Sequence, residues 1–415
     1  MYTKPCTAPS SEPRCQFDAP LPSSTSQTPP APPWPYRPGL TPSPSPLRPH
    51  CLVKECLKLW IPSYNHSQVA HNTHGDETQT SGEQLNCILE VMGPSWAKKT
   101  KETYGAGLLA YQVFCDAHDI PEPQRAPIRA NTLLSFLSSC AGSYPGSALA
   151  NFTAGLRAWH LLHGLPWQIN AEELKVILEG ASRLAPASSK RPLREPFRVD
   201  TLELFHSLLD LESHRDAAIF ACLTVVFYCV GRLGEFTVQS IKLFDPMKHI
   251  TRAHVSHLHN LNGLPVTKFR IPWTKASPTG EDVQCAPLEG VTNPIGALKC
   301  HFRINPADPD AHLFTWKHPT SGLRPLSRSE VTKCIASLTA AHNLPNLKGH
   351  SLRIGGTLHY LLHGTPFDVV KMIGRWAGDS FTIYLRQHAM ILAPYLNDTP
   401  VLLEFFMRYT MPPVR

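Results

Sequence analysis

The sequence GHSLRIGGTLHYLL, residues 349–362, combines a helical pattern with polar side chains that packing alone would not require. Its apolar residues recur at helical spacing. The helix begins with two basic side chains, His350 and Arg353, which share one face because they stand at positions i and i+3. Free backbone N–H groups at a helix start also favour a bound anion. The stretch therefore predicts a helix whose first turn is suited to an anion.

Two flanking stretches add polar residues that packing alone would not require. Downstream, IGRWAGDSFTIYLRQH (373–388) predicts a helix capped by Asp379 or Ser380, with Tyr384 about one turn in, although a tyrosine on a helix usually belongs to the core. Upstream, RDAAIFACLTVVFYCVGRLGEF (215–236) predicts a buried helix that ends at Arg232 and Glu235. An arginine beside such a helix needs an anion or a fixed partner. Either Arg232 binds an anion, or it forms a structural pair with Glu235.

A β region lies between these helices. An Asn-Gly turn signal at 262–263 separates two extended stretches, and LPVTKFRIPWTKASPTGEDVQCAPL (264–288) predicts a hairpin with TKASPTG at its tip. Lys275 stands in that tip, where a lysine is ordinarily a solvated charge. The second half of the chain is thus predicted to hold helices around one small antiparallel sheet, with helical pattern again from Asn293 onward.

The order and spacing of these pieces resemble the tyrosine recombinase (phage integrase) family. R-x-x-E is followed by a hairpin lysine, H-x-x-R, Gly-Arg-Trp and a tyrosine about thirty residues beyond the second arginine. GHSLRIGGT, IGRWAGDSF and YLRQH look especially like the eukaryotic, crypton-like recombinases of mobile elements and their host-resident relatives. The resemblance to the catalytic domain covers roughly residues 195–400, and the helical 84–182 region is similar to the core-binding domain by pattern.

The resemblance implies transesterification at a DNA phosphodiester. A tyrosine attacks phosphorus and expels a 5′-hydroxyl, while guanidinium forks stabilise the charge that develops on the phosphoryl oxygens. It implies that Arg232 and Arg353 bind the phosphate and that Glu235 orients Arg232. Tyr384 would be the nucleophile, and His350 would accept its proton. Lys275 would be the general acid, and Trp376 a further donor to the phosphate. No metal and no cofactor is called for.

One position departs from the family pattern. The family commonly has His or Trp directly after the glycine, nine residues before the nucleophile, and here that position is Arg375. Trp376 follows one residue later. Either Trp376 reaches the phosphate after a one-residue adjustment, which we favour, or Arg375 supplies the donor.

Composition divides the chain into segments. Residues 1–83 hold many prolines, fifteen of them within residues 1–50, and are predicted to be a disordered tail. Five helical stretches without a strand pattern predict an all-helical, core-binding (SAM-like) domain at 84–182. A Pro- and charge-rich linker follows at 183–199, then the mixed α/β catalytic domain at 200–400 and a C-terminal segment at 401–415. The predicted fold class is mainly α, with an α+β catalytic domain.

Charge and partners are consistent with this organisation. The net charge of +7 falls entirely within residues 84–415, and Lys98, Lys99 and Lys101 open one predicted helix. The cluster either contacts DNA phosphates or is an ordinary solvated face. The expected partner is double-stranded DNA, with self-association to a dimer or tetramer on it, and the expected location is the nucleus. No apolar run is long enough to span a membrane.

Several alternatives remain open from sequence. His254, His257 and His259 resemble a metal site only weakly, because only the last two share a strand face. Tyr360, predicted to be core, and Tyr395 are rivals of Tyr384. The same scaffold also fits a catalytically inactive DNA-binding protein domesticated from a mobile element, or a type IB topoisomerase.

Overall fold

The computed structural model describes residues 40–63, 69–71, 77–79, 82–190, 192–275, 277–384 and 388–396. The chain forms two compact units, Met1–Arg191 and Pro192–Arg415, each with its own hydrophobic core. The division lies within the stretch predicted to be a linker.

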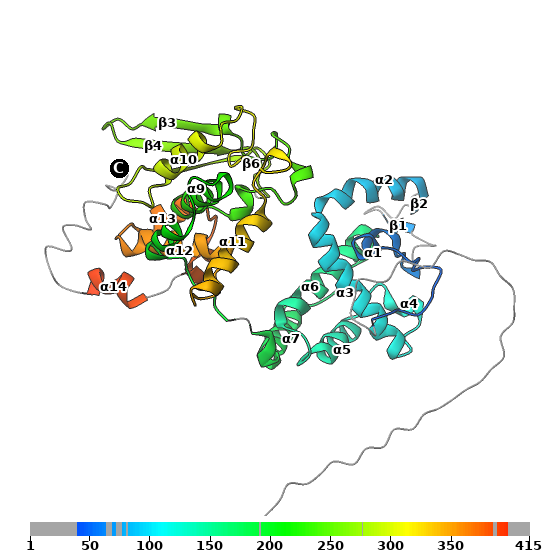
Figure 1. The fold of residues 1–415 in the computed structure, drawn as a ribbon. Coiled ribbons are helices and arrows are strands. Elements are labelled where there is room, and N and C mark those ends of the chain that lie inside the picture. Colours follow the sequence, from blue (N-terminus) through cyan, green and yellow to red (C-terminus); the bar gives the residue numbers. More distant parts are fainter. Residues whose placement is uncertain are drawn as a thin grey trace, which may run out of the picture. The chain divides into compact units, whose positions relative to one another are not determined.

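The first unit is helical around a long central helix, α3, which packs against α1 and α6 (Figure 1). Its core includes Tyr111, Phe136 and Trp159. A short antiparallel pair, β1 and β2, precedes the helices predicted from 84 onward. The helices and strands of this unit are α1 (Val53–Leu59), β1 (Val69–His71), β2 (Glu77–Gln79), α2 (Gly82–Met92), α3 (Lys98–Ala117), α4 (Glu122–Arg125), α5 (Ala130–Cys140), α6 (Gly146–Leu162) and α7 (Ala171–Leu184).

The prediction that residues 1–83 lack packed structure is wrong for α1 and its flanks. Val53, Leu57 and Trp60 recur at three- and four-residue spacing and are buried in the core of the first unit. Trp159 donates its indole N–H to the carbonyl oxygen of Trp60, at 2.7 Å. This short amphipathic stretch is therefore held by contacts with residues about a hundred positions away, which its own sequence does not reveal. Residues 1–39 lie outside the described part.

The second unit is built around α9, in which every residue from Ala217 to Tyr228 is buried. Helices α10 and α12 pack against it, and the sheet β3–β4–β5 lies along one side of the unit (Figure 1). Its elements are α8 (Val199–Leu208), α9 (His214–Tyr228), β3 (Val255–His259), β4 (Pro265–Ile271), β5 (Glu281–Cys285), α10 (Pro294–Ile304), β6 (Trp316–His318), β7 (Gly322–Arg324), α11 (Arg328–Ala341), α12 (Gly349–Leu362), α13 (Phe367–Gly374) and α14 (His388–Leu396).

The predicted hairpins are present in this sheet. Strand β4 pairs antiparallel with β3 and with β5, so that Phe269 lies opposite Val255 on one side and Val283 on the other. Gly263, with φ of 75°, makes the first turn possible, because such an angle favours glycine. The mainly helical fold with a mixed second domain is confirmed.

A second small sheet in this unit was not predicted. Strands β6 and β7 form a separate two-stranded antiparallel sheet, where the sequence suggested only helices after Asn293. Each strand has three residues, too few for an alternating pattern to be recognised. None of the helices in the described part of the chain is long and apolar enough to cross a membrane.

Candidate active site

Helix α12 carries His350 and Arg353 and lies directly on the backbone of α9. A Cβ atom on Gly356 would stand 2.1 Å from the carbonyl oxygen of Phe227, so only glycine permits this approach. The close packing fixes the start of α12 beside the end of α9, where Arg232 follows. Two stretches more than a hundred residues apart in sequence are thereby brought together.

Arg353 is only 1% exposed and is held by backbone carbonyls. Its Nη1 donates to Val230 O at 2.7 Å, and its Nη2 donates to Gly374 O at 2.5 Å. Val230 adopts a φ of 48°, which is unusual for a β-branched residue. Burial, followed by the nearby charge of Arg232, lowers the pKa of Arg353 to about 10, so its guanidinium stays charged at neutral pH. The sequence does not reveal this enclosure.

Each residue of the Gly-Arg-Trp motif, 374–376, has its own role in the local structure. A Cβ on Gly374 would fall 1.7 Å from the Trp376 ring, so glycine makes room for the indole. The guanidinium of Arg353 lies 4.2 Å from the centre of that ring, within cation–π range. Arg375, between them, has a left-handed backbone with φ of 57°. Trp376 therefore covers Arg353, while Arg375 points elsewhere.

Arg232 precedes a short 3₁₀ turn, Leu233–Glu235, at the end of the buried helix. Its side chain is 45% exposed, and Nη1 lies 2.7 Å from Glu235 Oε1. Glu235 also accepts the backbone N–H of Arg232, at 3.0 Å. Burial alone would raise the pKa of Glu235, but the charge of Arg375 and hydrogen bonds from Arg232 lower it overall. Glu235 stays ionised and orients Arg232, whose guanidinium remains accessible.

Tyr384 contacts His350. Its hydroxyl oxygen lies 3.0 Å from His350 Nε2, and the two rings are 5.2 Å apart. The centres of the Trp376 and Tyr384 rings lie 5.8 Å apart. Burial, followed by the charges of Arg194 and then Arg353, Arg232 and Arg328, lowers the pKa of His350 to about 4. The imidazole is therefore neutral at pH 7.

The backbone around Tyr384 differs from the prediction. A 3₁₀ segment, Asp379–Tyr384, ends at the tyrosine, so Tyr384 does not lie one turn into an α-helix. Within this segment Phe381 is buried, with its ring 5.6 Å from that of Trp376 and 6.2 Å from that of Phe367. Tertiary packing of Phe381 accounts for the position of the tyrosine. The side chains of Asp379 and Ser380 lie outside the described part.

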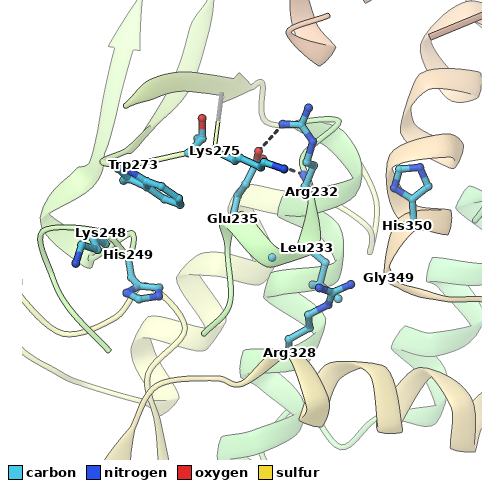
Figure 2. A pocket seen from close by; sticks show the side chains of 12 residues that line it. Arg232, Leu233, Glu235, Lys248, His249, Trp273, Lys275, Arg328, Gly349 and His350 are labelled. Carbon is cyan, nitrogen blue, oxygen red and sulfur yellow. Dashed lines mark hydrogen bonds and ion pairs between the residues drawn. The ribbon is translucent and has the colours of Figure 1, made fainter. Parts of the chain in front are cut away.

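Arg232, Glu235 and His350 border a cavity of about 710 Å³ (Figure 2). Figure 2 shows Arg232 and Glu235 between Lys275 and Trp273 on one side and His350 on the other. Lys275 is exposed and lies in the loop between β4 and β5, as predicted. Arg353, Trp376 and Tyr384 do not line the cavity: the arginine lies beneath Trp376, and Tyr384 reaches the site through His350.

Three further charged residues were missed from sequence. Arg328, at the start of α11, lines the cavity, and the charges of Arg328 and Arg194 both act on His350. Glu281, the first residue of β5, is paired with Arg375. Arg328 follows the N-cap Ser327, and a basic residue at that position carries no distinctive signal. Only the fold brings these three side chains to the site.

Of the two rival tyrosines, the structure describes the side chain of Tyr360 alone. Tyr360 is partly buried and donates its hydroxyl to Tyr228 O at 2.8 Å, which confirms the prediction that it packs in the core. His257 contacts Thr267 Oγ1 at 2.9 Å. Within the described residues, no group of three or more metal-binding side chains is assembled. The side chain of Tyr395 lies outside the described part.

Lys98, Lys99 and Lys101 occupy the first turn of α3 in the first unit. The first two are exposed, and they border a hollow of about 550 Å³ together with Lys54 of α1. The cluster is thus larger by one lysine than the sequence suggested. Its contact with DNA phosphates stays a prediction.

No family model and no curated protein sequence matches the chain. Among solved structures, the chain is similar to the XerH site-specific recombinase bound to palindromic difH substrate, in a post-cleavage complex (13% identity, TM-score 0.49, covering 76% of this chain and 84% of that chain). It is also similar to the Tn1549 transposon integrase in complex with transposon right end DNA (12% identity, TM-score 0.43, covering 77% of this chain and 98% of that chain). A third similar structure is a Flpe–Holliday junction complex (12% identity, TM-score 0.32, covering 78% of this chain and 86% of that chain). All three TM-scores are below 0.5, so a function has to be argued from the site itself.

Proposed function

We propose that the chain is a tyrosine recombinase that breaks and rejoins duplex DNA through a 3′-phosphotyrosine intermediate. The observation that carries the proposal is the 3.0 Å contact between His350 Nε2 and Tyr384 Oη, two residues 34 positions apart. The charges of two arginines, Arg232 and Arg353, both act on this histidine. A packing tyrosine needs neither a neutral imidazole nor cationic neighbours, whereas a tyrosine nucleophile needs both.

In the proposed step the Tyr384 oxygen forms a bond to phosphorus, and the bond from phosphorus to the 5′-oxygen breaks. The tyrosine proton passes to His350 Nε2, and Lys275 gives a proton to the departing oxygen, which leaves as a 5′-hydroxyl. Reversal of the same step by a second 5′-hydroxyl rejoins the strand. No external energy source is needed, because the phosphotyrosine ester keeps the energy of the diester bond.

The charges of the site favour this division of roles. A histidine with a pKa of about 4 is neutral at pH 7, so its Nε2 accepts a proton when Nδ1 carries the ring hydrogen. Arg232 offers a half-exposed guanidinium to the non-bridging phosphoryl oxygens. Arg353 uses two of its five N–H groups on carbonyl oxygens, which leaves three for a phosphate or for water.

A second candidate is a DNA-binding protein without cleavage activity. The enclosure of Arg353 favours it, because a guanidinium covered by Trp376 must become exposed before it can contact a phosphate. In either case we propose double-stranded DNA as the partner, the crypton-like, mobile-element-derived branch as the origin and the nucleus as the location. Self-association to a dimer or tetramer on DNA also belongs to this proposal.

A nicked suicide substrate separates the two candidates. Its short 3′ fragment diffuses away after cleavage, so that even slow attack accumulates a covalent adduct. We expect the natural chain to form a protein–DNA adduct that survives denaturation, and Tyr384→Phe to form none while it binds duplex with unchanged affinity. If the natural chain binds the duplex but yields no adduct, the binding-only function is correct.

A further inference from the structure

A chain of side-chain contacts connects the loop of Lys275 with the segment that carries Arg232. Thr274, the neighbour of Lys275, donates its hydroxyl to Glu281 Oε1 at 3.1 Å and accepts the N–H of Ser277 at 2.9 Å. Glu281 Oε2 accepts a hydrogen bond from Arg375 Nη1. Arg375 Nη2 in turn donates to Glu235 Oε2, at 2.6 Å.

Glu235 completes the connection, because its two oxygens bind the side chain and the backbone N–H of Arg232. Arg375 thus lies between two carboxylates from separate parts of the unit: Glu235 follows α9, and Glu281 begins β5. All three side chains are largely buried. A buried guanidinium between two carboxylates fixes geometry well, because its donors lie in one rigid plane.

The backbone of Arg375 agrees with a dedicated role. Its left-handed conformation is disfavoured for any residue with a Cβ atom, and glycine or asparagine is usual at such a helix end. The ion pairs with Glu235 and Glu281 compensate for this conformation. Trp376, the next residue, is free to cover Arg353 only because Arg375 turns the chain at this point.

We propose that Arg375 is a positioning residue that sets the distance between Lys275 and Arg232, and thus between the leaving 5′-oxygen and the phosphoryl oxygens. The proposal rests on the function proposed above. This role also accounts for the presence of Arg375 where the family commonly has His or Trp. Arg375 acts through Glu235 and Glu281 and does not itself contact the phosphate.

The test compares two leaving groups. In a substrate with sulfur in place of the bridging 5′-oxygen, the departing group is a thiol, whose pKa is about 8.5. That of an alcohol is close to the value of about 15.7 for water. A thiolate therefore leaves without a general acid, and a defect in placing Lys275 disappears on the sulfur substrate. A defect in placing Arg232 persists on both substrates.

Thr274→Val is the decisive variant, because it removes both hydrogen bonds of the hydroxyl and changes the volume little. We expect adduct formation on the oxygen substrate to slow by roughly 10- to 100-fold, the scale of a misplacement of about 1 Å, and the sulfur substrate to react at the natural rate. Glu281→Gln is expected to give a weaker effect with the same preference. Arg375→Lys, which cannot span both carboxylates, is expected to slow both substrates, the oxygen substrate more.

Thr279→Val is the matched control, since Thr279 is an exposed threonine in the same loop. It is expected to leave both rates unchanged, and duplex affinity and near-ultraviolet circular dichroism check that every variant is folded. Equal slowing of the two substrates by Thr274→Val, or no slowing of either, overturns the proposal. If the natural chain forms no adduct on either substrate, the proposed function itself fails and the positioning role fails with it.

Discussion

The two arginines assigned to the same phosphate differ in burial, and this predicts a difference in stability. Arg353 is 1% exposed and is bound to two backbone carbonyls, whereas the Arg232 side chain is 45% exposed and pairs with one glutamate. Replacement by lysine keeps the positive charge at both positions but removes the planar fork. We expect both variants to lose activity and only Arg353→Lys to lose substantial stability.

The magnitude follows from the contacts. Lysine at position 353 can satisfy one of the two carbonyls, so one charge-assisted hydrogen bond is lost, which costs about 1.5–3 kcal/mol. Part of the cation–π contact with Trp376, of about 2 kcal/mol in a desolvated setting, is lost as well. Together these give a loss of about 3 kcal/mol in the free energy of unfolding. Arg232→Lys should cost less than about 1 kcal/mol, as for an exposed ion pair.

Differential scanning calorimetry of the full chain measures this difference. For a unit of the size of Pro192–Arg415, a loss of 1 kcal/mol lowers the Tm by about 2–4 °C. Arg353→Lys should therefore lower the transition of the second unit by roughly 6–12 °C. Arg232→Lys should lower it by less than about 4 °C. Cleavage rates should fall by about 10²–10³ in both variants, as after loss of an oxyanion donor.

Equal Tm shifts in the two variants would contradict the account of Arg353. So would an unchanged Tm in Arg353→Lys, because the buried hydrogen bonds to Val230 and Gly374 would then contribute nothing measurable.

Three other predictions concern different parts of the molecule. His350 should titrate by NMR near pH 4 and not near 6.5. Because its pKa is lowered, its contribution to stability is full above about pH 6.5 and declines as the pH falls toward 4. A midpoint near 6.5 would place the ring in solvent. Replacing Lys98, Lys99 and Lys101 together by alanine should weaken binding to any duplex about equally and reduce the salt slope by up to about 2.7; an unchanged slope would make the cluster a solvated face. Gly356→Ala should destabilise the second unit by about 1–3 kcal/mol, because its Cβ would stand 2.1 Å from Phe227 O. Gly180→Ala, in α7 with open space around it, should be neutral or slightly stabilising. Urea denaturation distinguishes the two variants, and equal effects would argue against the close contact of α12 with α9.

The sequence predicted well what depends on local pattern. The buried run of α9 and the turn signals of the β3–β4–β5 sheet depend on periodicity and on turn residues, which a single sequence displays. The motif residues were found by order and spacing. Their approach to one another follows from α12 lying on α9, and nothing in a single sequence shows that Gly355 and Gly356 permit this contact.

Features that depend on distant contacts were not predictable. Helix α1 lies in the stretch predicted to be a disordered tail, yet it is buried against residues far along the chain, such as Trp159. The sequence left Arg375 as an alternative phosphate donor. Its actual partner, Glu281, lies in a hairpin 94 residues earlier, and no local pattern connects the two. Arg353 was expected to face the phosphate directly. Burial of a charged residue by an aromatic ring has no signature in spacing.

Peptide mapping of the covalent adduct shows directly whether Tyr384 is the nucleophile. Trypsin cleaves after Lys371, Arg375 and Arg386, so Tyr384 becomes the single tyrosine of the peptide 376–386, while Tyr360 and Tyr395 fall in the peptides 354–371 and 387–408. After nuclease treatment of a suicide-substrate reaction, mass spectrometry should find a nucleotide attached through its 3′-phosphate to peptide 376–386. Attachment to either of the other two peptides, or no modified peptide from DNA-bound protein, would contradict the account.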